Sequence, residues 1–308
     1  MGLSLNLRNV LFGEDPTGAA EIRPKQRSTV SEVVRFAYGF FFRRFWTLLR
    51  LVWFPFFLAG FLLYQCFSGY LAQLLLYLSA PNPHAASLGL GWLAAGVLMP
   101  LFCYAVAIAA ISGLMLEGTD KGTLVHFQAQ RREWRLYAAY LRFLLIVAVA
   151  IGLIAFSSIF ALSRLDIPRP LGIWVPVVLG FAAVYWLVAR VAFFIVPLAA
   201  EKQGPILRSA WKSSGSDILR ISGLIFILLV PGVVVQILGE YVLRKLMAAP
   251  AVTGNPPLVD YAHFVGQFLL GFLVVAGLSS FITVTLLTAG AIAYYRSQER
   301  AGSPLHAM

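Results

Sequence analysis

The chain has 308 residues, of which 60% are hydrophobic and only 12% are charged, whereas about a quarter of the residues in a soluble domain are charged. This composition excludes an ordinary water-soluble globular protein and predicts a surface that faces lipid. The formal net charge of +11 comes from basic residues that flank apolar segments, so we expect anionic lipid headgroups and no nucleic acid as the counter-charge.

The first 28 residues combine charged residues and two prolines, without the apolar core of a cleavable signal, and we expect a mobile cytoplasmic tail there. Thr29 and Glu32 then have the spacing of a capping box, which predicts that a helix begins at this point. Apolar residues at helical spacing follow it beside charged ones, as in a helix that lies in the membrane interface: Val33, Phe36, Ala37, Phe40 and Phe41. The alternative is a cytoplasmic extension of the first span.

Six apolar segments follow, each about 20 residues or longer, which is the length that crosses a hydrocarbon core of roughly 30 Å. They cover about 46–78, 88–116, 136–162, 173–198, 218–238 and 264–295, and proline-containing loops group them into three hairpins. Because they are apolar all round, helices are expected and barrel strands are not. The sequence predicts an all-α transmembrane helical bundle over residues 29–300, with a C-terminal tail at 301–308. The first and sixth segments exceed the bilayer thickness, so they should tilt, bend or project.

The distribution of lysine and arginine predicts the orientation, since positively charged loops stay in the cytoplasm. The loops opposite the termini hold only Arg164, Arg169, Arg244 and Lys245. The other side holds Arg35, Arg43, Arg44, Lys121, Arg131, Arg132, Arg135, Lys202, Arg208, Lys212, Arg296 and Arg300. We expect a multi-pass protein of a bacterial inner (plasma) membrane with both termini in the cytoplasm.

Small residues spaced by four would allow close helix approach in the second and third spans, namely Ala105, Ala109, Gly113, Ala148 and Gly152. Ordinary packing within the membrane explains this spacing equally well.

A second surface helix is expected after Gly204 and Pro205, where Ile206, Leu207, Ala210 and Trp211 face away from Arg208 and Lys212. A weaker candidate spans 124–134, so each hairpin would follow one surface segment, in a threefold repeat.

Charged groups inside the spans are few, and Arg190 is the deepest. It has a functional interpretation, a site for a lipid phosphate or another anion, and a structural one, a snorkelling side chain or an anchor to carbonyls or a carboxylate. Glu201, eleven positions after Arg190, would lie on nearly the same face of an unbroken helix and could form a salt bridge with it. Pro197, between the two, would bend that helix. The candidate lipid-binding or anion-binding residues are Arg190, Arg50, Arg208 and Lys212.

The sequence predicts no catalytic residue, metal site or cofactor. Its four histidines are scattered over loops and the tail, and Cys66 and Cys103 lie in apolar segments. The sixth span carries hydroxyls that could line a polar path, but we expect them to bond to carbonyls of their own helix: Ser279, Ser280, Thr283, Thr285 and Thr288.

Between residues 190 and 231, the fourth span ends in an arginine and a proline, and an acid, a Gly-Pro pair and a Ser-x-Trp sequence follow. These are Arg190, Pro197, Glu201, Gly204, Pro205, Ser209 and Trp211. The pattern resembles bacterial membrane families of the YciC-like type and the membrane domain attached to some glycerophosphoryl diester phosphodiesterases, in which serine and tryptophan are adjacent. The resemblance implies a helical membrane domain; no phosphodiesterase domain is present, and no catalytic residue is carried over.

We therefore expect a non-enzymatic membrane protein that organises membrane lipids, with anionic headgroups as partners, or that organises partner proteins. One alternative is a transporter or lipid flippase that uses Arg190 and the hydroxyls of the sixth span. A second is a membrane enzyme acting on lipids, with Glu201 or Asp217 as acid or base.

Overall fold

The computed structural model describes residues 29–79, 83–118, 130–164, 169–201, 205–214, 217–247 and 258–300, and regular structure within these ranges is entirely helical. The helices are α2 (Val30–Arg43), α3 (Phe45–Ser79), α4 (Pro83–Glu117), α5 (Arg131–Arg164), α6 (Arg169–Leu187), the π-helical turn η1 (Val188–Ala192), α7 (Phe193–Glu201), α8 (Ile206–Ser213), α9 (Ile218–Met247) and α10 (Leu258–Arg300).

Six helical stretches in this part of the chain are long and apolar enough to cross a membrane. They are Phe45–Tyr70, Leu88–Leu116, Arg131–Ser157, Val177–Ala200, Ile218–Lys245 and Leu273–Glu299. The prediction of an all-α, six-span membrane protein is confirmed. The first and last spanning helices, α3 and α10, are longer than the bilayer requires, as expected from the sequence. The 43 residues of α10 extend about 65 Å, twice the roughly 30 Å hydrocarbon core.

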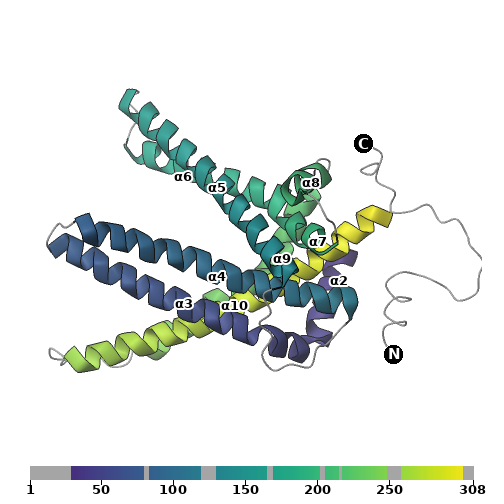
Figure 1. Cartoon of the computed structure of the whole chain (residues 1–308), viewed down its shortest axis with the longest axis horizontal. Coiled ribbons are helices and arrows are strands. Elements are labelled where there is room, and N and C mark those ends of the chain that lie inside the picture. Colours follow the sequence, from purple (N-terminus) through teal and green to yellow (C-terminus); the bar gives the residue numbers. More distant parts are fainter. Residues whose placement is uncertain are drawn as a thin grey trace, which may run out of the picture.

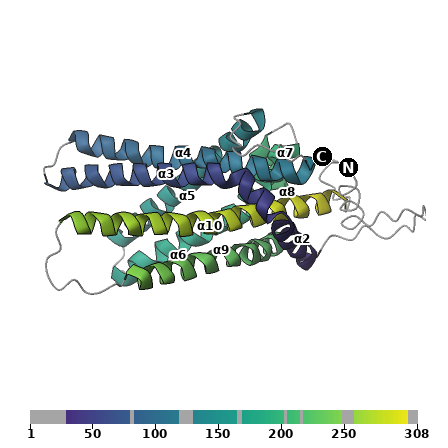
Figure 2. The same cartoon turned by 90° about the horizontal axis from the view of Figure 1, so that it is seen from below.

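The spans form three antiparallel hairpins, α3 with α4, α5 with α6, and α9 with α10 (Figure 1). The C-terminal end of α10 lies at the same end of the molecule as α2, α7 and α8, and both views agree on this (Figures 1 and 2). We call this end the near side and the opposite end the far side. The hairpins meet toward the near side and diverge toward the far side, where α5 and α6 point away from α3 and α4 (Figure 1).

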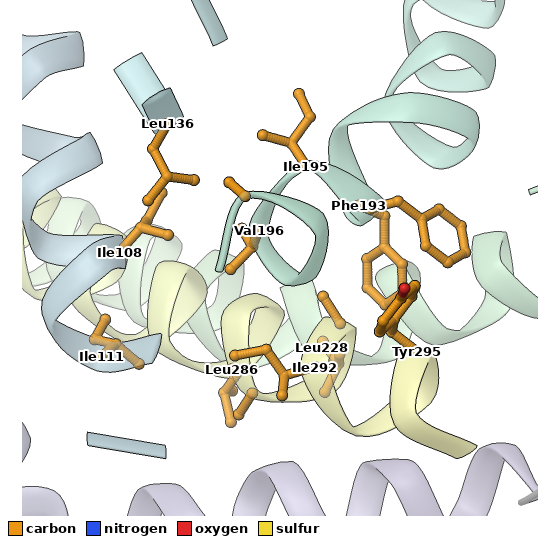
Figure 3. Close-up of a cluster of buried hydrophobic side chains, with 14 of the residues drawn as sticks. Ile108, Ile111, Leu136, Phe193, Ile195, Val196, Leu228, Leu286, Ile292 and Tyr295 are labelled. Atoms are coloured by element: carbon orange, nitrogen blue, oxygen red, sulfur yellow. The ribbon is translucent and has the colours of Figure 1, made fainter. Parts of the chain in front are cut away.

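The buried core lies where the hairpins meet. Ile108 of α4, Leu136 of α5, Val196 of α7 and Ile292 of α10 all contribute to one cluster of buried apolar side chains (Figure 3). Burial is uneven among the spans, since half of the second span is buried but only 17% of the third. The second hairpin is therefore the one that presents most of its surface to the surroundings.

Small residues act differently in different helices. In α4, Ala105 and Ala109 are buried, as the spacing predicts. In α5, however, Ala148 and Gly152 are exposed, and no atom lies within 4 Å of a Cβ built on Gly152. Within the described part of the chain, the small residues of α5 therefore lie on an exposed face, and no helix makes use of the close approach that their spacing would allow at Gly152.

Helix α2 begins as predicted, with a complete capping box. The Glu32 N–H donates to Thr29 Oγ1 over 3.4 Å, and the Thr29 N–H donates to Glu32 Oε2 over 2.9 Å. One of its faces packs on other helices of the chain, principally α10, and buries Val33, Ala37 and Phe41. Those three side chains therefore face protein instead of lipid.

Candidate functional site

Arg190 lies on a turn of π-helix that interrupts the fourth span between α6 and α7. A π-turn contains one residue more than an α-turn, and such turns often accompany functional sites. The chain continues as regular helix through Pro197, which is buried inside α7. The π-helical turn lies five to nine residues before Pro197, about two helical turns, and nothing in the hydropathy of Val188–Ala192 indicates it.

Two tryptophans cover the guanidinium of Arg190. Its Cζ lies 4.2 Å from the ring centroid of Trp211 and 5.2 Å from that of Trp186. The two indoles themselves meet edge to face, with centroids 5.3 Å apart and an angle of 80° between planes. Trp186 precedes Arg190 by four residues on the same helix, whereas Trp211 is supplied by α8, which packs on α7 and η1. We call Trp186, Arg190 and Trp211 the indole–arginine site.

The site holds an unsatisfied hydrogen-bond donor. Nε of Arg190 is buried and has no hydrogen-bond partner in the part of the chain that the structure describes. A buried donor without a partner costs about 1–3 kcal/mol, more when it is charged, so a bound acceptor would relieve a standing penalty. The side chain of Glu201 lies outside the described residues, and its predicted ion pair with Arg190 stays a prediction.

The site is open to the outside of the molecule. Trp186 and Trp211 keep 41% and 40% of their surface exposed. On α6, Ala182 and Val178 lie four and eight residues before Trp186, on the same helix face, and both are exposed. A continuous apolar stripe therefore runs from the arginine toward the far side. Tyr185 ties this part of α6 to α9, because its hydroxyl donates to the Ser222 carbonyl over 2.9 Å.

Helix α8 bears the other predicted basic candidates. It starts at Pro205 as its N-cap, buries Ala210 and leaves Arg208 and Lys212 exposed. The Ser214 hydroxyl donates to the Trp211 carbonyl over 3.0 Å and closes the last turn. The structure thus brings Trp211 of α8 onto η1, whereas Arg208 and Lys212 are exposed on α8 and Arg50 is exposed on α3 in the first hairpin.

The hydroxyls of α10 join helices to one another. Ser279 Oγ donates to the Gly232 carbonyl of α9 over 2.8 Å, and the Tyr104 hydroxyl of α4 lies 3.3 Å from Ser280 Oγ. The expectation that Ser279 bonds within its own helix is wrong. Thr285 and Thr288 are buried, and Thr285 Oγ1 has no hydrogen-bond partner among the described residues.

Asp217, one of the two residues that the enzyme alternative would use as acid or base, forms hydrogen bonds within the structure. Its Oδ2 accepts a hydrogen bond from the Tyr294 hydroxyl over 3.2 Å and one from Gln298 Nε2 over 3.3 Å. Asp217 precedes α9, and its partners lie near the C-terminal end of α10. The carboxylate therefore links the start of α9 to the end of α10 on the near side. In the described residues, no group of three or more histidine, cysteine or acidic side chains is arranged to hold a metal ion.

These features define a multi-pass helical membrane protein with an exposed, aromatic-flanked arginine site. Comparison with protein-family models, with curated proteins and with solved structures gives no match. The resemblance to YciC-like families stays a prediction, and function has to be argued from the site.

Proposed function

We propose that this protein is a non-enzymatic inner-membrane protein that binds and organises anionic phospholipids on its near side, which faces the cytoplasm. The observation that carries the proposal is the guanidinium of Arg190, covered by two exposed indoles and holding a buried Nε without a partner. The predominance of lysine and arginine on that side of the spans supports the orientation.

The chemistry of the indole–arginine site suits a phosphate. Guanidinium presents its donors in the plane of the group, so a phosphate can form a bidentate bond with it while an indole lies over its face. Indoles favour the boundary between headgroups and hydrocarbon, because the ring is apolar and the N–H is polar. The exposed stripe through Ala182 and Val178 would lie along an acyl chain of the same lipid.

The test is lipid retention measured by native mass spectrometry on protein released from nanodiscs of phosphatidylcholine mixed with phosphatidylglycerol. Arg190→Gln should weaken retention of the anionic lipid about tenfold, since hydrogen bonds to charged groups contribute about 1.5–3 kcal/mol. Arg244→Gln is the matched control, because it removes the same charge from an exposed far-side position whose partner is Glu240. The proposal would be contradicted if the wild type retained both lipids equally. It would also be contradicted if Arg190→Gln retained as much phosphatidylglycerol as the wild type.

A transporter or flippase for an anionic substrate is the second candidate. It is favoured by η1, since interrupted helices often surround the substrate in transporters. Reconstituted liposomes carrying a fluorescent anionic lipid distinguish the two: a lipid-organising protein leaves the inner-leaflet pool protected from a membrane-impermeant quencher, whereas a flippase exposes it. Loss of that exposure in Arg190→Gln would assign the movement to the site.

A further inference from the structure

The junction of α2 and α3 exposes aromatic rings beside positive charges. Arg44 separates the two helices. On either side of it, Phe42 is 70% exposed and Trp46 is 78% exposed, and Arg43 and Arg44 are exposed as well. We call these four residues the α2–α3 corner. It lies on a different hairpin from the indole–arginine site.

Contacts with α9 and α10 position α2, and with it the corner. Phe41 is buried, and its ring centroid lies 5.7 Å from that of Phe281 in α10. The Tyr38 hydroxyl donates to the Ile227 carbonyl of α9 over 3.2 Å. Phe42 lies one turn after Tyr38, with ring centroids 6.5 Å apart, so Tyr38 holds the inner side of the Phe42 ring while 70% of Phe42 stays exposed.

The charge at the corner is not balanced by nearby acids in the sequence. From residue 30 to residue 44 the sequence contains three arginines and a single acidic residue, Glu32. The carboxylate of Glu32 accepts the Thr29 N–H at the helix start, two turns or more before the corner. The excess of positive charge is complementary to an anionic surface.

We infer that the α2–α3 corner inserts into the headgroup layer of an anionic lipid leaflet and holds the near side at the level of that layer. Aromatic rings next to arginines are the chemistry of interfacial anchors, with the rings below the phosphates and the guanidinium groups among them. The most exposed rings are therefore Phe42 and Trp46, whereas three of the five residues that the sequence predicts for the lipid face, Val33, Ala37 and Phe41, are buried against the protein.

Hydrogen exchange of the full chain in nanodiscs tests this inference. Amides of residues 41–50 should exchange more slowly in discs containing phosphatidylglycerol than in phosphatidylcholine alone. The double variant Arg43→Gln/Arg44→Gln should lose this lipid-dependent protection, by about fivefold for each charge removed. The double variant Arg244→Gln/Lys245→Gln removes two exposed charges from the far end of α9 and should keep it.

A second measurement stays informative if the arginine variants fold poorly. Tryptophan emission should be quenched more by a lipid nitroxide near the headgroup than by one near the chain terminus, and Trp46→Phe should remove part of the shallow quenching. Equal exchange in neutral and anionic discs, together with unchanged quenching in Trp46→Phe, would overturn the inference. Lipid retention at Arg190 is measured in a separate experiment. The proposed lipid binding at the indole–arginine site and the inferred insertion of the α2–α3 corner can therefore be contradicted independently.

Discussion

At the scale of single residues, one hydroxyl compensates for a proline in a neighbouring helix. Pro231 has no N–H, so the carbonyl of Ile227, four residues earlier in α9, lacks its helical partner. The Tyr38 hydroxyl donates to that carbonyl from α2, 189 positions away in the sequence. A local defect in a transmembrane helix thus becomes the docking point of a surface helix.

Removing this hydroxyl should loosen α2. We expect Tyr38→Phe to cost about 1–3 kcal/mol, because the Ile227 carbonyl is left without a partner. Tyr185→Phe is the control and should cost less, since residue 226 is not a proline and Ser222 keeps its helical N–H. Thermal unfolding in detergent, followed by circular dichroism, measures both. Equal losses in the two variants would contradict the role of Pro231.

The same hydroxyl predicts a pH dependence. Partial burial raises the pKa of the Tyr38 phenol above its usual value of 10.0. Because the pKa of Tyr38 is higher in the folded protein than in the unfolded chain, the protonated hydroxyl contributes its full stabilisation below pH 10. That contribution is lost as the pH rises through the folded pKa of Tyr38. Protection of α2 amides should therefore fall above pH 10 in the wild type, and that fall should be smaller in Tyr38→Phe.

At the scale of elements, glycines let α9 and α10 approach closely along the hairpin. A Cβ on Gly232 would collide with Thr283, and one on Gly290 would collide with Leu228. The Ser279 carbonyl, which belongs to the backbone and cannot turn aside, lies 3.1 Å from the Cβ position of Gly232. The third hairpin is thus packed through its backbones, unlike the second, where Gly152 and Gly180 meet nothing within 4 Å.

This contrast predicts opposite effects for two alanine substitutions in α9. Gly232→Ala should destabilise the protein by about 1–3 kcal/mol, because an added methyl group has no space. Gly223→Ala should be neutral or stabilise by up to about 1 kcal/mol, since no atom lies within 4 Å and alanine favours helix. Midpoints of thermal unfolding in detergent compare them, and a loss of similar size in both would show that the close approach is not responsible.

At the scale of the whole molecule, six spans place α2, α8 and the end of α10 on one side (Figures 1 and 2). Toward this side the hairpins share a core, and toward the far side each behaves as an arm of two helices. Exposed apolar residues cover these arms, for example Leu153, Phe156 and Phe181. Lipid, in place of protein, should fill the space around them.

The proposed orientation is open to a direct test by cysteine labelling in cells, in a background in which Cys66 and Cys103 are replaced by alanine. Cysteines at Ser31 and Ser213 should react only when the membrane is made permeable, since both positions belong to the basic side. A cysteine at Asn82, in the connection between the first two spans, should react in intact cells with an impermeant reagent. The reverse pattern would invert the topology.

The sequence by itself determined the class of the molecule, the number of spans and the start of α2 at Thr29. These depend on local requirements, because crossing hydrocarbon takes about 20 apolar residues and a capping box takes two residues three apart. Only the tertiary structure decided which apolar faces meet. Lipid chains are as apolar as leucine, so hydropathy does not distinguish a lipid-facing side chain from a protein-facing one. Three features depend on which helix faces meet. They are the contact of Trp211 with Arg190, the π-helical turn that carries Arg190, and the hydrogen bond from Tyr38 to the Ile227 carbonyl.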